Sequence, residues 1–286
     1  MPENYQRKPD WLKIKVPSGK EYVRVKEIIS RHKLHTICSS GKCPNMAECW
    51  GLGTATFMIL GDICTRSCKF CATKTGKPVM EDVDEPVNLA NSIKLMNLKH
   101  CVITSVDRDD LEDGGAKHWA AVISEVKRVN PGITIETLIP DFMGKKDLIK
   151  LVIDAKPEVI SHNLETVRRL TPAVRSAAQY DRSLEVVRQI AGSGITAKSG
   201  IMVGLGETEE EVFEVMDDLL RVGCSVMTIG QYLQPTKNHL PVTGFIHPKV
   251  FEKWAQTGRE KGFKFIESKP LVRSSYHAEK HVAGKC

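Results

Sequence analysis

Six apolar runs rich in β-branched residues recur along the middle of the chain, at residues 56–61, 101–106, 133–139, 159–163, 196–203 and 226–233. Runs of this length and composition are typical of buried β-strands, and the stretches between them show helical periodicity. Strand, helix and strand in alternation, repeated at intervals of about 25 to 45 residues, build right-handed βαβ units. We therefore predict an α/β fold with a parallel sheet, either open or curved into a barrel.

The clearest helix is expected over residues 209–222. Thr208 followed three residues later by Glu211 forms a capping box, and Gly223 is a typical residue at a helix end. One face of this helix collects the apolar side chains of Val212, Val215, Met216, Leu219 and Leu220. An amphipathic helix of this kind packs on one side of a sheet.

The strand and helix alternation covers residues 53–235 and leaves an N-terminal extension, residues 1–52, and a C-terminal extension, residues 236–286. A chain of 286 residues is long enough for a single barrel. Both extensions are basic and the middle is acidic, although the net charge is only +6. That charge does not predict nucleic-acid binding without a motif. The basic ends indicate either a solvated surface or attraction for an acidic partner.

The expected compartment follows from what the sequence lacks. It has no run of eighteen apolar residues, so no membrane span is expected, and its first residues do not resemble a secretory or transit signal. We expect a cytoplasmic protein, and nothing in the sequence indicates an obligate dimer, so a monomer is expected. In that compartment cysteines stay reduced, and closely spaced ones more often bind metal than form disulfides.

Six of the nine cysteines form two triads, which are Cys38, Cys43 and Cys49, then Cys64, Cys68 and Cys71. Three thiolates are one ligand too few for a tetrahedral metal site or a cubane cluster. The other three cysteines carry no such pattern: Cys101 and Cys224 border apolar strands and are expected to be buried, and Cys286 is expected to have no role. The triads predict two metal centres, each with a position to be filled by something else.

The second triad has the spacing CxxxCxxC and follows the first predicted strand. Catalytic groups of parallel α/β folds gather at the carboxyl ends of the strands. Such a loop can bind three corners of a [4Fe-4S] cluster and leave the fourth iron open, whereas a structural zinc site would need a fourth ligand. With Phe70 before the last cysteine and GLGE at 204–207, the chain resembles the radical S-adenosylmethionine superfamily.

The resemblance implies a partial TIM-like (β/α)6 barrel, which agrees with the six strands found independently. It implies that the amine and carboxylate of S-adenosylmethionine chelate the open iron. It also implies that one electron from the cluster cleaves the sulfonium to a 5′-deoxyadenosyl radical, which abstracts hydrogen from an unactivated carbon.

The first triad has the spacing C-x4-C-x5-C, which alone is compatible with zinc, with His32 or His35 as fourth ligand, or with a second cluster. Near the other end stands RSSY, Arg273–Tyr276, which alone reads as a polar segment with an aromatic anchor. Taken together with ECW after the first triad and CTRSCKFC, these motifs resemble the lipoyl synthase family from about residue 30 to residue 280. The resemblance implies that Cys38, Cys43, Cys49 and Ser275 bind an auxiliary [4Fe-4S] cluster, with Ser274 as the weaker candidate. Cys64, Cys68 and Cys71 would bind the other.

The activity implied by the resemblance is radical insertion of sulfur at C6 and C8 of an octanoyl chain carried on a protein lysine. Two S-adenosylmethionine molecules are used per product, and the auxiliary cluster supplies the sulfur. A serine oxygen is a weaker ligand for iron than a thiolate, which suits a cluster that is consumed. The implied partners are octanoylated lipoyl carrier domains, namely the acyltransferase (E2) subunits of 2-oxoacid dehydrogenases and the glycine cleavage H protein. An electron donor such as flavodoxin or ferredoxin and an iron-sulfur cluster carrier are also implied.

Polar residues at predicted strand ends are candidates for cofactor binding. Asn163 and Glu165 are expected to hold ribose or methionyl groups, and Lys198, like Arg108, to meet a carboxylate. Gly204 and Gly206 would allow close backbone approach to the adenosyl group. Each of these residues has an alternative role in satisfying loop backbone.

Two other functions compete with this reading: a different radical enzyme whose auxiliary cluster transfers electrons, and an adaptor that carries zinc or a cluster.

Overall fold

The computed structural model describes residues 7–14 and 19–282, so Cys286 lies outside the described residues. Eight strands form one sheet in the order β1-β2-β5-β6-β7-β8-β9-β10. Neighbours from β2 to β10 are parallel, and β1 is antiparallel to β2. The strands are β1 His35–Thr36, β2 Thr56–Ile59, β5 His100–Ser105, β6 Thr134–Leu138, β7 Val159–Ser161, β8 Thr196–Val203, β9 Val226–Gln231 and β10 Phe265–Ser268.

All six predicted strands are present, as β2 and β5 to β9. In the described part of the chain β1 and β10 pair with β2 and β9 but not with each other, so the curved sheet stays open. The predicted partial (β/α)6 barrel is therefore confirmed, with one strand added from each extension. The sequence did not indicate β10, because it is short and half-buried and depends on pairing with β9.

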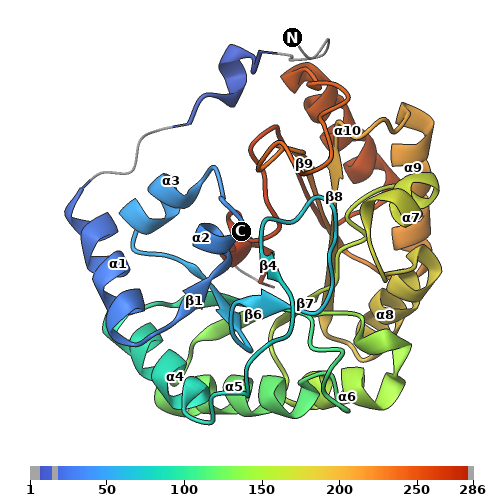
Figure 1. Cartoon of the computed structure of the whole chain (residues 1–286). Helices are drawn as coiled ribbons and strands as arrows, with labels where there is room; N and C mark the ends of the chain where they lie inside the picture. The colour runs from blue at the N-terminus through green and yellow to red at the C-terminus, as the bar shows by residue number, and fades with distance from the viewer. Residues whose placement is uncertain (1–6, 15–18, 283–286) are drawn as a thin grey trace.

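Helices cover the outside of the sheet (Figure 1). Those that follow the strands are α4 Glu85–Met96, α5 Ala116–Val129, α6 Lys146–Asp154, α7 Thr171–Val174, α8 Tyr180–Gly192, α9 Glu209–Arg221 and α10 Pro248–Lys261. The predicted helix is α9, whose capping box between Thr208 and Glu211 is formed. Gly223 follows its end with φ of 85°, a conformation that favours glycine.

The N-terminal extension carries α1 Lys20–Arg31, α2 Ile37–Ser40 and α3 Met46–Gly51. A separate two-stranded sheet, β3 Ile63–Cys64 with β4 Lys74–Thr75, follows β2. The described residues also form four 3-10 turns: η1 Asp10–Leu12, η2 Phe142–Gly144, η3 Arg168–Leu170 and η4 Ala278–His281. None of the described helices is long and apolar enough to cross a membrane.

Candidate functional site

The second triad lies on the loop between β3 and β4, above the carboxyl ends of the barrel strands. Cys64 closes β3, and its carbonyl accepts a hydrogen bond from the amide of Gly76 just after β4, which closes the loop into a ring. The Cys64 thiol receives the amide N–H of Arg66 at 3.4 Å and that of Asp107 at 3.3 Å. Burial raises the pKa of Cys64 to about 12. The same two amide donors would favour a thiolate bound to iron.

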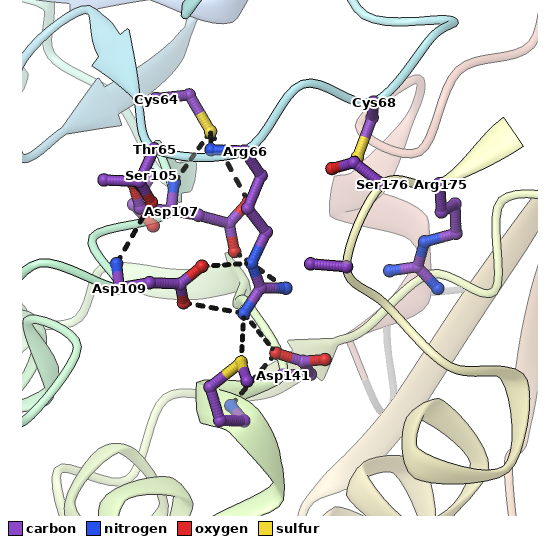
Figure 2. Close-up of polar contacts among 12 residues, drawn as sticks. Cys64, Thr65, Arg66, Cys68, Ser105, Asp107, Asp109, Asp141, Arg175 and Ser176 are labelled. Carbon is purple, nitrogen blue, oxygen red and sulfur yellow. Dashed lines mark hydrogen bonds and ion pairs between the residues drawn. The ribbon is translucent and has the colours of Figure 1, made fainter. Parts of the chain in front are cut away.

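Arg66, between the first two cysteines of this triad, clamps the loop to the barrel (Figure 2). Its guanidinium lies 3.3 Å from the Asp107 carboxylate, 2.7 Å from Asp109 and 2.7 Å from Asp141. Asp141 is fully buried after β6, and Arg66 lowers its pKa to about 2 against the opposing effect of burial. The charge of Arg66 therefore ties the loop to the ends of β5 and β6.

Replacing Arg66 by methionine is expected to destabilise the metal-free protein by about 3 to 5 kcal/mol, because Asp141 loses its main counter-ion in a buried site. Urea unfolding of the metal-free protein measures the effect. Arg169→Met is the control, since Arg169 makes an exposed pair with Glu211 worth at most ~1 kcal/mol. Equal losses in the two variants would contradict the clamp.

Three further contacts join the loop to residues for which the sequence alone predicts no role. The imidazole Nε2 of His239 lies 2.9 Å from the Cys71 carbonyl, to which it donates, and the amide of Lys69 donates to the Val174 carbonyl. Ser176 lies beside Cys68, with 3.9 Å between oxygen and sulfur (Figure 2). These partners lie far along the chain from the cysteines, and only folding brings them to the loop.

A cavity of about 310 Å³ lies between this loop and the strand ends. All three cysteines of the second triad line it, together with Asn163 and Glu165. The Asn163 amide donates to the Glu165 carboxylate at 3.1 Å, while its own Oδ1 is buried with no hydrogen-bond partner among the described residues. Burial raises the pKa of Glu165. Glu165 has φ of 65°, and its backbone bonds to Gly200 and Met202 hold that unfavourable conformation.

The other predicted cofactor residues lie elsewhere. Lys198 is buried and ion-paired with Glu136, and Arg108 forms a bidentate pair with Asp110. Gly204 is required by its protein neighbours, because a Cβ there would lie 2.5 Å from the Gly244 carbonyl oxygen. Gly206 lies near Thr243. The structure therefore brings Asn163 and Glu165 to the cavity and not Lys198, Gly204 or Gly206.

His162 also lines the cavity and is neutral at ordinary pH. Its Nδ1 lies 2.9 Å from the Ile139 carbonyl, which can only accept, so Nδ1 carries the proton. Nε2 then accepts from the Ser183 hydroxyl at 3.0 Å. Burial, aided by the Arg175 charge, lowers the pKa of His162 to about 4.

This lowered pKa predicts a loss of stability in acid. Between pH 6.5 and 4 the unfolded chain binds a proton at His162 that the folded protein does not, so stability falls as pH falls. We expect the step from pH 7 to pH 5 to cost the metal-free protein about 2 kcal/mol more than it costs the His162→Gln variant. Urea unfolding at both pH values measures this difference, and equal losses would contradict it.

The first triad is built by the short helices α2 and α3. Cys38 lies in α2, Cys49 lies in α3, and the amide of Cys43 between them donates to the Cys38 carbonyl at 3.0 Å. Burial and mutual repulsion raise the pKa of Cys43, and they raise that of Cys49 to about 12. Burial also raises the pKa of Cys38. Metal binding would have to drive the deprotonation of this triad.

The C-terminal RSSY segment lies against the first triad although more than 220 residues separate them in sequence. The Asn45 amide donates to the Leu271 carbonyl at 2.8 Å, and the Tyr276 hydroxyl donates to Glu48 at 3.1 Å. The Ser275 hydroxyl accepts from the Thr56 hydroxyl at 2.9 Å. Ser275 and Cys49 line a second cavity, of about 400 Å³, whereas Ser274 lines the first.

The donor sets fit iron-sulfur clusters. The six triad cysteines are all free thiols. Among the described residues no three His, Cys, Asp or Glu side chains converge tightly enough for a single metal ion. A cube-shaped cluster holds its thiolates at separate corners and needs wider spacing. At the first triad, the indole N–H of Trp50 is buried, has no hydrogen-bond partner in the part of the chain that the structure describes, and faces Cys38, so it could donate to sulfur.

Comparison with solved structures supports the fold. The chain matches SuiB of Streptococcus suis bound to its precursor peptide with a TM-score of 0.59 at 10% identity, covering 86% of this chain and about half, 52%, of that one. It matches HydG, a maturase of the [FeFe]-hydrogenase, with a TM-score of 0.57 at 14% identity, covering 91% of this chain and 70% of HydG. At such low identity these matches establish the barrel architecture alone.

Comparison with the sequences of known proteins gives matches of much higher identity. Residues 58–219 match the Radical SAM superfamily, and residues 2–43 match the N-terminal domain of lipoyl synthase of the Radical SAM family. The lipoyl synthase of Phocaeicola vulgatus is 65% identical over 282 residues, 99% of each chain, and that of Bacteroides fragilis is 66% identical over 96% of each. The lipoyl synthase of Treponema denticola is 61% identical over 97% of this chain and 96% of its own. With identity of this order along nearly its whole length, the chain belongs to the lipoyl synthase family of the radical S-adenosylmethionine superfamily.

Proposed function

We propose that this chain inserts two sulfur atoms, at C6 and C8, into an octanoyl group carried on a protein lysine. One observation carries the proposal. A single cavity is lined both by the cysteines of the second triad and by residues that flank the first triad, together with Arg273 and Ser274 of the RSSY segment. A substrate in this cavity would lie between the two predicted cluster sites.

Each triad has a distinct role in this proposal. Cys64, Cys68 and Cys71 hold a [4Fe-4S] cluster with one iron open to S-adenosylmethionine, and Cys38, Cys43, Cys49 and Ser275 hold the auxiliary cluster. When bound, these groups supply the radical chemistry and the sulfur. The protein's own contribution is to hold the two clusters near one shared cavity and to position Ser275, a weak ligand for iron, at the first triad.

Asn163 and Glu165 support a cofactor site beside the second triad. The Asn163 Oδ1, unpartnered among the described residues, can accept from an amine or a ribose hydroxyl, and Glu165 offers a half-buried carboxyl next to it. Arg175 also lines the cavity, and its Nε is buried with no hydrogen-bond partner in residues 7–14 and 19–282. An arginine in this place suits the carboxylate of the methionyl group. Lys198, Gly204 and Gly206 are not among the residues that line this cavity, so we assign the cofactor contacts to Asn163, Glu165 and Arg175.

The same cavity suits an acyl chain. Its lining is largely apolar, with Leu138, Ile139, Ile201, Met202 and Val272 among the lining residues. We assign this acyl chain to the octanoylated carrier domains of 2-oxoacid dehydrogenases and of the glycine cleavage system. The proposed reductant is a flavodoxin or ferredoxin, and a cluster carrier would rebuild the spent cluster. We further propose that the protein is a monomer and lies in the cytoplasm.

The experiment is anaerobic incubation of the reconstituted protein with an octanoyl-lysyl peptide, dithionite and S-adenosylmethionine, followed by mass spectrometry. We expect two added sulfurs in the peptide and about eight irons per chain, four for each cluster. S-adenosylmethionine cleavage with an unchanged octanoyl group would favour a radical enzyme with an electron-transfer cluster. Zinc without iron would favour an adaptor and overturn the proposal.

A further inference from the structure

A buried ion pair crosses the barrel interior outside the cavity lining. Lys198 on β8 and Glu136 on β6 lie 2.7 Å apart, between Nζ and Oε1, and their side chains are 0% and 1% exposed. The Ser161 hydroxyl on β7, between these strands, donates to the same Glu136 oxygen at 3.2 Å. Removing two charges from water costs free energy that their attraction often does not recover, so stability alone does not explain this pair.

The C-terminal tail, residues 269–282, supplies the third member of this group. His281 in η4 is fully buried, and its Nδ1 lies 3.1 Å from the Lys198 Nζ. An ammonium group can only donate, so the Lys198 Nζ donates and the His281 Nδ1 accepts. Among the described residues, Glu136 and His281 are the two acceptors for Lys198. The tail therefore satisfies one of the two hydrogen bonds that this buried charge makes.

The tail is held at two places. At one end His281 meets Lys198, and Ala278 and Val282 beside it are buried. Six positions earlier, Ser275 meets Thr56 and Tyr276 meets Glu48 at the first triad. Between them the chain turns at His277, with φ of 51°, and the Lys280 amide donates to the His277 carbonyl. A segment fixed at both ends of so short a span has little freedom to withdraw Ser275.

We propose that the Glu136–Lys198 pair is the receptor for His281 and that this contact anchors the tail so that Ser275 stays at the first triad. The inference rests on the proposed role of Ser275 as the auxiliary-cluster ligand. Glu136, Lys198 and His281 are positioning residues. Because a serine oxygen binds iron weakly, the local concentration of that oxygen decides whether the fourth iron is covered. Anchoring raises this concentration without making the ligand itself stronger.

Hydrogen exchange in the metal-free protein tests the anchor directly. In His281→Ala we expect the backbone amides of residues 275–281 to exchange about tenfold faster, since one hydrogen bond to a charged group is lost. Lys280→Ala is the matched control, because Lys280 lies in the same turn with an exposed side chain. It should leave exchange at the other tail amides unchanged. Unchanged exchange in His281→Ala overturns the proposal.

A second variant removes the receptor and leaves the tail sequence intact. In Glu136→Gln/Lys198→Met both charges are lost together, a change that is often tolerated in a buried site. We expect the barrel to unfold at a similar urea concentration and the tail to exchange as fast as in His281→Ala. A stable barrel with a fully protected tail would overturn the proposal. If the double variant does not fold, the His281→Ala result decides.

The consequence for the cluster is measured with the second triad replaced by alanine, so that only the auxiliary cluster binds. Iron loss to a chelator is followed by absorbance, and His281→Ala should lose iron about tenfold faster than the parent. Equal rates with a loosened tail would overturn the positioning role alone. If the parent with an intact tail binds no cluster at the first triad, the proposed function itself fails.

Discussion

Replacing Cys68 by alanine is expected to abolish formation of 5′-deoxyadenosine from S-adenosylmethionine. Among the three cysteines of the second triad, Cys64 is buried and its sulfur accepts two backbone amides, so its loss would also disturb the loop. Cys68 is half-buried, and its sulfur makes one polar contact among the described residues, with the Ser176 hydroxyl at 3.9 Å. Its replacement therefore removes a cluster corner with little effect on folding. The product is measured by chromatography after anaerobic reduction with dithionite.

Cys101→Ala is the matched control, because Cys101 is a buried cysteine within β5 that touches neither triad in the proposed scheme. It should retain about eight irons per chain and normal cleavage, whereas Cys68→Ala should retain about four. Unimpaired S-adenosylmethionine cleavage in Cys68→Ala would show that the radical cluster lies elsewhere.

Replacing Ser275 by cysteine is expected to strengthen the auxiliary cluster and weaken sulfur transfer. A thiolate binds iron more tightly than a serine oxygen, so the cluster should resist chelators but release sulfur about tenfold more slowly or worse. The site accommodates the change, since within the described part of the chain the Ser275 hydroxyl makes one hydrogen bond, with Thr56, and lines a cavity beside Cys49. Lipoyl-lysine formed per auxiliary cluster, measured by mass spectrometry in a single turnover, gives the result.

Ser274→Cys separates the two adjacent serines. Ser274 lines the cavity between the triads and not the one beside Cys49, so this variant should keep the chelator sensitivity of the parent. If Ser274→Cys gains resistance and Ser275→Cys does not, the ligand is Ser274. Normal lipoyl-lysine yield in Ser275→Cys would show that a weak oxygen ligand is not needed for sulfur release.

The barrel was predictable because its strands are buried on both faces and therefore read as continuous apolar runs. Each of the six runs became a strand, and the capping box at Thr208 and Glu211 marked where α9 begins. β10 was missed because Phe265–Ser268 is only half-buried and carries a charge, and its strand form comes from pairing with β9. Local sequence does not encode a strand that exists through its neighbour.

The candidate site residues also divide into those that local sequence identified and those whose contacts depend on the fold. The two cysteine triads, Asn163 and Glu165 were identified by spacing, motif or position at a strand end. Lys198 also lies on a strand, but its side chain enters the barrel interior toward Glu136. The position of a residue in a strand predicts which face of the sheet its side chain lies on, but not which residue it contacts there. The sequence therefore could not distinguish a cofactor contact from a structural ion pair.

The sequence by itself determined the barrel, the family and the two groups of thiols, because each is written in a local pattern of periodicity or spacing. Only the tertiary structure decided what holds those groups in place. Arg66 meets carboxylates at positions 107, 109 and 141, and Ser275 meets Thr56 at a separation of 219 residues. His281 contacts Lys198, which is 83 residues away in the sequence. Such contacts depend on which distant segments of the chain pack together in the fold. Buried charged groups must form hydrogen bonds, and they form them with the elements that packing places beside them.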